Sequence, residues 1–322
     1  MSDQNYFEKD AISATLLKAI IKQSPVHAEE RMKSFEPTAN MKLGTAFHAI
    51  MLEPENYGDL IAVTPNVDRR TKAGKEEYNK FLETVGQKTI ITTEQEGLVQ
   101  LMWASTASHP EFTRLNELCY AKEMEIDFMF EGMQCKSKID MVDDNGTIVD
   151  IKTTQDASPE AFMRQSANLL YHLQLAWYAK AMGLKWNEVD AYIVAVENSK
   201  PHGVAVYKFS QIALLEGWEL CKRGVELWKE YKENCVLGYG SFPYGKETVE
   251  LDLPMWARNG VETVCPQRRK QQKQRRNQHG QCCQRLTVLN MSKRRGDSHI
   301  FRGRGRGESS WNIIQAQHST II

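Results

Sequence analysis

The chain has 322 residues, and its 41 basic and 41 acidic side chains give a formal net charge of zero. Hydrophobic residues make up 41% and charged residues 25%, which is ordinary for a globular protein with a buried core. No apolar run approaches about 18 residues, which excludes a conventional transmembrane helix.

The amino terminus and the cysteines indicate a cytoplasmic protein. The first residues lack the basic start and the apolar core of a signal peptide. The seven cysteines are odd in number and form no Cys-x-x-Cys pair, so we predict free thiols rather than a zinc ribbon or an iron–sulfur cluster.

The charge is spread unevenly along the chain. From Cys265 to the end, 13 Lys and Arg residues face only Asp297 and Glu308, a net charge of +11, whereas the preceding residues carry −11. Residues 261–322 are rich in Gln, Arg and Gly and lack apolar periodicity, which predicts a disordered tail after a domain at residues 1–260. The tail is either a nucleic-acid-binding arm or a terminal extension without a selected role, such as one read in a shifted frame. The abrupt change of composition favours the extension.

Helical patterns dominate the start of the domain. Amphipathic periodicity predicts helices over Ile12–Lys22, with Ser13 as its cap, and over Met41–Leu52. Residues 57–90 are polar and predict irregular structure, and a further helix is predicted over Thr93–Ala107.

The periodicity then changes to that of a sheet. Alternating polar and apolar residues over Glu123–Phe130 predict a half-buried strand, and further strands are predicted over Cys135–Val142 and Thr147–Thr153. The sequence Asp-Asp-Asn-Gly at 143–146 predicts a hairpin turn between the last two strands.

The remaining segments complete a mixed α and β pattern. We predict one long helix over Ser158–Met182, strands over Val189–Val196 and Val204–Phe209, and a helix over about Ile212–Lys232. The order predicts an α/β fold with a mixed sheet flanked by helices and an N-terminal helical portion, with a core at about residues 41–235.

Charged residues fall at the ends of two neighbouring predicted strands. Asp150 and Lys152 are two residues apart on one strand and project from the same face, and Asp140 on the preceding strand can reach the same point. Converging carboxylates need a cation, and hard oxygen ligands suit Mg²⁺ or Mn²⁺. Such a metal would activate water, while Lys152 would orient or deprotonate that water or neutralise the transition state. The pattern predicts hydrolysis of phosphodiesters.

The acid-x-Lys triplet alone is a weak signal. A second instance, Glu230-Tyr231-Lys232, falls in a predicted surface helix, and Asp150 with Lys152 could equally form a solvent-facing ion pair. The strand–turn–strand context and the position of Asp140 favour an active site.

Four segments in order resemble a known nuclease family. They are Ile12-Ser13-Ala14-Thr15-Leu16-Leu17-Lys18 with Ser24-Pro25, then Gly44-Thr45-Ala46-Phe47-His48, then Lys138-Ile139-Asp140 with Val149-Asp150-Ile151-Lys152-Thr153-Thr154, and finally Tyr171-His172-Leu173-Gln174 through Tyr178. Over roughly residues 10–256 the chain resembles the exonuclease VIII (RecE-type) exonucleases of phages and prophages, within the PD-(D/E)xK (RecB-like) superfamily. Lys138 stands where that family has Arg, which is a mild departure.

The resemblance implies a restriction-endonuclease-like core and a set of site residues. His48, Asp140 and Asp150 would be metal ligands, the backbone carbonyl of Ile151 a further ligand, and Lys152 the catalytic lysine.

It also implies that one helix face, with Tyr171, Gln174 and Tyr178, looks into the active site, where Gln174 would hold the lysine or a phosphate. Alternatives remain, because a lone histidine is more often a buried or capping residue and Tyr178 could simply pack against the sheet. Glu125 could bind a second metal or face solvent.

The activity implied is an Mg²⁺- or Mn²⁺-dependent exodeoxyribonuclease that degrades linear double-stranded DNA from an end, 5′→3′, leaving 3′ single strands for recombination. The implied partners are DNA ends, a RecT-type single-strand annealing protein and copies of the chain in a ring, with no membrane. The alternatives are another PD-(D/E)xK endonuclease, a Cas4-like end-processing enzyme, which the cysteines disfavour, and a catalytically idle prophage DNA-binding protein. The presence of both aspartates and Lys152 disfavours the idle protein.

Overall fold

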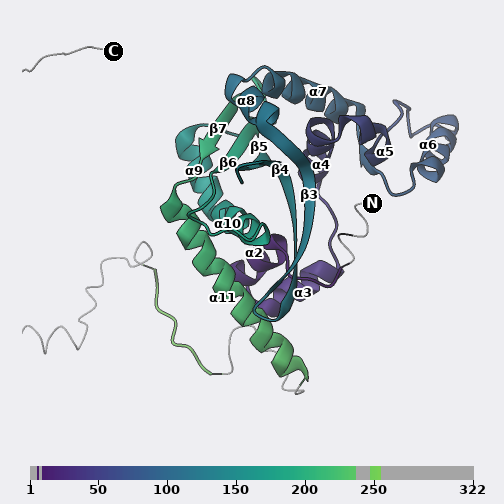
Figure 1. Ribbon diagram of the computed structural model, residues 1–322. Helices are drawn as coiled ribbons and strands as arrows, with labels where there is room; N and C mark the ends of the chain where they lie inside the picture. The colour runs from purple at the N-terminus through teal and green to yellow at the C-terminus, as the bar shows by residue number, and fades with distance from the viewer. Residues whose placement is uncertain (1–5, 7–8, 237–246, 255–322) are drawn as a thin grey trace, which may run out of the picture. The chain divides into compact units, whose positions relative to one another are not determined.

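The computed structural model describes Tyr6 and residues 9–236 and 247–254 (Figure 1). The chain divides into two units, Met1–Glu247 and Thr248–Ile322. Of the second unit, residues 248–254 are described, and they are exposed and without regular secondary structure. The predicted disordered tail and the predicted boundary at residue 260 lie outside the described residues.

The first unit contains a five-stranded mixed sheet with the strand order β3-β4-β5-β6-β7. Its strands are β3 Cys119–Phe130, β4 Met133–Asp143, β5 Ile148–Thr154, β6 Ala191–Glu197 and β7 Val204–Lys208. The β5–β6 pair is parallel and the other three neighbouring pairs are antiparallel. The first four residues of β5 are buried, which is expected for a central strand covered on both faces.

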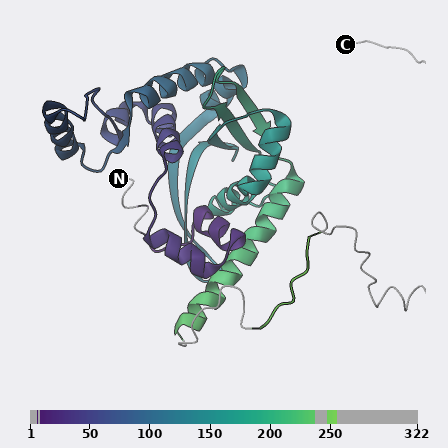
Figure 2. The ribbon, with the colours of Figure 1, turned by 180° about the vertical axis from the view of Figure 1, so that it is seen from behind.

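Helices cover both faces of this sheet (Figures 1 and 2). One face carries α2 Ala14–Lys22, α9 Pro159–Asn168, α10 Tyr171–Ala181 and α11 Gln211–Val236, while α3 Pro25–Lys33 packs beside α2. The other face carries α4 Ala39–Leu52, α7 Thr93–Ala107 and α8 Pro110–Leu118. Neighbouring residues on β5 enter different apolar layers, because Ile148 packs with Leu175 of α10 and Val149 packs with Phe47 of α4. The predicted mixed α/β architecture, with a sheet between helices, is confirmed.

Local sequence signals account for several element boundaries. The Ser13 side chain accepts a hydrogen bond from the Leu16 N–H at 3.3 Å, as its predicted role as a cap requires. The helix predicted over Thr93–Ala107 is found with those bounds, and Thr92 and Gln95 form a capping box before it. At the predicted hairpin, Gly146 has a φ of 81°, a conformation that glycine adopts at little cost.

The long helix predicted over Ser158–Met182 is wrong, because the chain breaks between α9 and α10. After Pro159 the sequence contains no Gly or Pro up to Met182, so its helical pattern continues through the break. Leu170 takes a left-handed conformation with a φ of 54°, which costs roughly 1–2 kcal/mol for a side chain of this type. Leu170 packs against the apolar cluster shared by α2, α10 and α11, and this burial offsets the strain.

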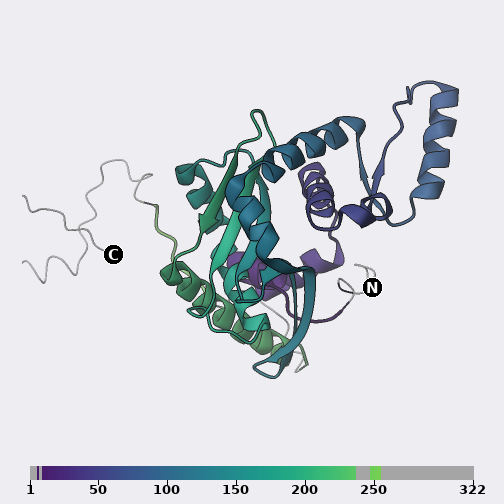
Figure 3. The ribbon, with the colours of Figure 1, turned by 45° about the horizontal axis from the view of Figure 1, so that its top comes forward.

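The prediction of irregular structure over residues 57–90 is also wrong. After the short helix η1 at Pro54–Asn56, this part contains α5 Tyr57–Leu60, β1 Ile61–Val63, α6 Lys72–Val85 and β2 Thr89–Ile91, with β1 and β2 paired in parallel. Figure 3 shows α6 away from the main sheet. Only Gly74 and Val85 of α6 are buried, and most of its residues are polar, so the segment has the composition of a surface loop although its few apolar residues recur at helical spacing.

Two short helices that the sequence pattern did not predict begin at prolines. Pro25 opens α3 after the cap Ser24, and Pro110 opens α8 after His109. Among the helices that the structure describes, none combines the length and apolar character that a bilayer span requires. The cysteines of the described part, Cys119, Cys135, Cys221 and Cys235, are free thiols.

Candidate active site

The candidate site lies where β4 and β5 separate. The two strands pair only at Met141–Val149 and Val142–Ile148. Asp140 immediately precedes Met141 on β4, and its side chain lies between the two strands where they separate. Its Oδ2 accepts a hydrogen bond from the Ile151 N–H of β5 at 2.7 Å. The ladder therefore ends at a buried carboxylate that takes the place of a backbone acceptor.

A first group of side chains gathers around this carboxylate. His48, on the helix α4 that Phe47 anchors in the core, places its Nδ1 3.5 Å from Asp140 Oδ2. Glu123 of β3 joins them, and one ligand atom from each of the three residues lies within 4.8 Å of the others. The structure thus brings together two predicted ligands, His48 and Asp140, with a carboxylate that the sequence analysis did not select.

Glu123 reaches the site because of an unusual backbone conformation. It has a φ of 49° and sits between the register pairs Lys122–Met141 and Met124–Ile139, opposite Asp140. Its Oε2 lies 2.7 Å from Lys138 Nζ. The alternating pattern put Glu123 and Glu125 on one face but could not show which would lie across from Asp140. Glu125 is exposed.

A second group of side chains surrounds Asp150. Its Oδ2 lies 2.5 Å from Lys152 Nζ, as the spacing of the two residues on β5 predicts. Its Oδ1 accepts hydrogen bonds from Gln174 Nε2 at 2.9 Å and from the Tyr178 hydroxyl at 3.3 Å. Both donors come from α10, so the helix face expected to look into the site does contact it.

Tyr171 and Lys18 extend this second group. The Tyr171 ring centroid lies 5.6 Å from Lys152 Nζ and 5.2 Å from Lys18 Nζ. Lys18, on α2, also donates a hydrogen bond from its Nζ to Gln174 Oε1 at 2.5 Å. Gln174 therefore connects a second lysine to Asp150. Lys18 belongs to the first of the four motif segments, but the sequence alone indicates no role for it.

Burial and neighbouring charges shift the pKa values of these groups. Burial and the charge of Asp150 raise the pKa of Asp140 to about 7, and burial with Asp140 raises the pKa of Glu123. Burial and Lys152 lower the pKa of His48, which favours its neutral form. Burial acts to lower the pKa of Lys152, but Asp150 and Asp140 outweigh it and raise that pKa above its ordinary value.

The first group fits a divalent cation. A neutral imidazole nitrogen and two carboxylates converge, and burial raises the pKa of both carboxyl groups, so a bound cation would stabilise their charged forms. The Ile151 carbonyl accepts a hydrogen bond from the His48 ring, which puts the predicted carbonyl ligand beside this group. Both oxygens of Asp150 already contact other side chains, so its predicted role as a ligand stays a prediction.

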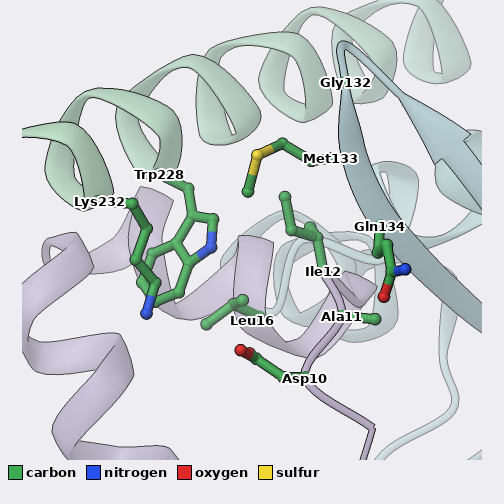
Figure 4. Close-up of a pocket in the computed structure, with 9 residues that line it drawn as sticks. All are labelled: Asp10, Ala11, Ile12, Leu16, Gly132, Met133, Gln134, Trp228 and Lys232. Atoms are coloured by element: carbon green, nitrogen blue, oxygen red, sulfur yellow. The ribbon is translucent and has the colours of Figure 1, made fainter.

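A pocket of about 230 Å³ lies apart from these two groups (Figure 4). The residues that line it come from the segment around α2, the β3–β4 turn and α11, and they are Asp10, Ala11, Ile12, Leu16, Gly132, Met133, Gln134, Trp228 and Lys232. None of them belongs to either group.

Comparisons with known proteins bear on the same residues. Residues 13–237 match a family described as a PDDEXK-like domain of unknown function (DUF3799), a range that includes every residue of both groups. A solved structure named "Putative exonuclease", from Eubacterium rectale, is similar over 78% of this chain and 96% of its own, with 13% identity and a TM-score of 0.49. A second structure, of SSO0001, covers 66% of this chain and 84% of its own, with 12% identity and a TM-score of 0.25. No curated protein matches this chain.

Proposed function

We propose that this chain, which belongs to the PDDEXK-like family (DUF3799), is a metal-dependent nuclease that hydrolyses phosphodiester bonds of linear double-stranded DNA. One observation carries the proposal, namely the meeting of the His48, Glu123 and Asp140 group with the Asp150–Lys152 pair where β4 and β5 separate. Metal ligands next to a buried lysine suit the hydrolysis of a charged diester, whose transition state gains negative charge.

The first group would hold the cation. His48, Glu123 and Asp140 would supply one nitrogen and two carboxylate ligands, with the Ile151 carbonyl and Asp150 as further proposed ligands. When bound, a divalent cation such as Mg²⁺ or Mn²⁺ supplies a Lewis acid that activates water and stabilises the charge on the phosphate oxygens. The Ile151 N–H holds the Asp140 carboxylate in place for this task.

Lys152 would contribute positive charge. Because Asp150 and Asp140 raise its pKa, the ammonium group is charged in the metal-free site. This favours orienting the attacking water or neutralising the transition state over deprotonating that water. Gln174 and Tyr178 hold Asp150, and Asp150 holds Lys152, so α10 sets the direction of the ammonium group.

The finer proposal is an exonuclease that acts 5′→3′ from DNA ends and leaves 3′ single strands for recombination. The four motifs that resemble the exonuclease VIII (RecE-type) enzymes support it, because all of them occur here in order. The same resemblance supports a RecT-type annealing partner, a ring of identical chains and a cytoplasmic location.

The decisive experiment compares end-labelled linear duplex DNA with a closed circular control. We expect Mg²⁺-dependent degradation of the linear substrate alone, with release of the 5′ label first and no activity in excess EDTA. Ca²⁺ should support binding better than cleavage, since its looser coordination suits the reaction poorly. Cleavage of the circle would indicate an endonuclease, and absence of cleavage under all conditions would indicate an idle DNA-binding protein.

Substitutions in the two groups test the site itself. Asp140→Ala, Asp150→Ala and Lys152→Ala should each abolish cleavage while the protein stays folded, and a double variant should lose little more than a single one because the groups act as a unit. Lys122→Ala, at an exposed lysine on β3, is the matched control and should keep full activity. A Lys152→Ala protein with normal cleavage would contradict the assignment.

A further inference from the structure

Lys18 is a partly buried lysine that the proposed reaction does not yet use. It lies on α2, and its ammonium group contacts Gln174 Oε1 at 2.5 Å and the face of Tyr171 at 5.2 Å. Through Gln174 it stands one side chain away from Asp150, on the α10 side of the sheet.

Within the described part of the chain, the ammonium group of Lys18 has no carboxylate to neutralise it. Among the residues that the structure describes, no Asp or Glu oxygen lies within ion-pair distance of Lys18 Nζ, whereas Lys152 has Asp150 at 2.5 Å. Burial and the nearby charge of Lys152 lower the pKa of Lys18 to about 7, although Asp150 acts in the opposite direction. A buried cation without a counterion is costly, and an anion placed beside it would remove that cost.

The site is therefore polarised. Acidic side chains converge on the side of His48, Glu123 and Asp140, where a metal cation fits, and the amino group of Lys18 lies beyond Asp150 and Gln174 without an acidic partner among the described residues. A DNA strand carries a phosphate at every nucleotide, so a strand whose scissile phosphate is at the metal presents other phosphates close by.

We propose that Lys18 binds a second phosphate of the substrate strand, next to the one that is cut. This inference rests on the proposed function and names the substrate group that this part of the site receives. The phosphate is either an internal diester or a terminal monophosphate, since both offer the oxygen acceptors that an ammonium group binds.

A purely positioning role makes a different prediction. Lys18 contacts Gln174 Oε1, so it could act only by keeping the Gln174 amide turned toward Asp150. In that case its loss would lower kcat and leave the salt dependence of DNA binding unchanged. A phosphate contact instead weakens binding and contributes about 0.9 to the slope of log affinity against log salt.

The test uses the full chain and five variants, which are Lys18→Met, Lys18→Arg, Lys22→Met, Gln174→Leu and the double variant Lys18→Met with Gln174→Leu. Lys22 is exposed on the same helix and provides the matched loss of charge, and methionine keeps most of the length of the lysine stem. Binding of a fluorescent linear duplex is measured with Ca²⁺ over a range of salt concentrations, and kcat and KM are measured with Mg²⁺. Each duplex is prepared with a 5′-phosphate and with a 5′-hydroxyl, and thermal melting checks that each variant is folded.

We expect Lys18→Met to weaken binding about tenfold or more, mainly through KM, and to lower the salt slope by about 0.9. Lys18→Arg should keep most of the affinity, and Lys22→Met should match the wild type. The Lys18→Met effect should persist in the Gln174→Leu background. If Lys18→Met loses affinity for both the 5′-phosphate and the 5′-hydroxyl duplex, Lys18 binds an internal phosphate. If it loses affinity only for the 5′-phosphate duplex, Lys18 binds the terminal phosphate.

The inference is overturned if Lys18→Met binds like Lys22→Met, if its salt slope is unchanged, or if no duplex binding is detected at all. These outcomes differ from a failure of the proposed function. If the wild type binds DNA with a salt slope that depends on Lys18 but never cleaves it, the proposed nuclease activity is wrong and the proposed phosphate contact stands.

Discussion

At the scale of single residues, Glu123 and Asp140 are the two carboxyl groups of the proposed metal site. They come from neighbouring strands, and burial raises both pKa values. Lys138 offsets part of the charge of Glu123, with its Nζ at 2.7 Å. Because a bound cation would offset the rest, metal affinity should depend on both residues.

Replacement of Glu123 tests whether it is a metal ligand. We expect Glu123→Gln to weaken Mn²⁺ binding by at least about tenfold in isothermal titration calorimetry, because a neutral amide replaces an anionic ligand. Glu125→Gln is the control, since Glu125 is exposed on the same strand. Equal affinities of the two variants would remove Glu123 from the ligand set.

Asp140 should make the stability of the metal-free protein depend on pH. Its pKa rises from 3.8 to about 7 on folding, so the folded protein holds a proton that the unfolded chain has released. The contribution of this group is fully present below about pH 4 and is lost as the pH rises through about 7.

Asp140→Asn cannot release this proton. In EDTA, the unfolding free energy of the variant should therefore rise relative to the wild type between pH 4 and pH 7 and then level off. Urea denaturation at several pH values measures this difference, and the contributions of groups that do not interact with Asp140 cancel in the comparison. Parallel stability curves would show that Asp140 is not buried as a carboxylic acid.

At the scale of elements, the position of α10 decides which side chains reach Asp150. The break at Leu170 starts a new helix at Tyr171, and α11 packs closely across it. A β-carbon added at Gly217 of α11 would lie 2.1 Å from the His172 carbonyl oxygen of α10. Glycine is therefore required at this crossing, and α10 cannot move away without losing its packing.

We expect Gly217→Ala to destabilise the protein by roughly 1–3 kcal/mol or more, because backbone atoms cannot yield to the added methyl group. Gly97→Ala in α7 is the control, since nothing lies within 4 Å of the added carbon. That variant should gain about 1 kcal/mol from the higher helix propensity of alanine. Urea denaturation measures both, and a stable Gly217→Ala protein would contradict the close approach of the two helices.

At the scale of the whole molecule, charge is divided between the body and the carboxyl-terminal segment. The residues before Cys265 carry −11 and those from it onward carry +11, so the body by itself repels DNA at long range. The basic segment from Cys265 onward lies outside the described residues, and truncation tests its contribution to DNA affinity.

Truncation after Gly260 should leave turnover on saturating linear duplex nearly unchanged. It should remove a salt-sensitive, sequence-independent part of DNA affinity and slow association at low salt, because phosphate contacts by Arg and Lys are screened by ions. Cleavage rates of the full and truncated chains over a range of salt concentrations measure both effects. Loss of turnover or of folding on truncation would move the domain boundary into the basic segment.

The sequence by itself predicted the elements whose signals are local. Alternation defined the strand that carries Glu123, and an Asn-Gly turn separated the strands that carry Asp140 and Asp150. Ser13 marked the start of α2, the helix over Thr93–Ala107 was predicted with the bounds of α7, and the two-residue spacing placed Lys152 beside Asp150. Helical spacing also put Tyr171, Gln174 and Tyr178 on one face. These inferences depend on periods of two and 3.6 residues, which every strand and helix follows.

Only the tertiary structure decided the features that depend on distant partners. The left-handed backbone at Leu170 is stabilised by burial against α2 and α11, and the choice of Glu123 over Glu125 follows from the register of β3 on β4. The contact of Lys18 with Gln174 joins residues 156 positions apart in the chain. No local pattern encodes these pairings, because their energy comes from packing and charge between segments that meet only when the chain has folded.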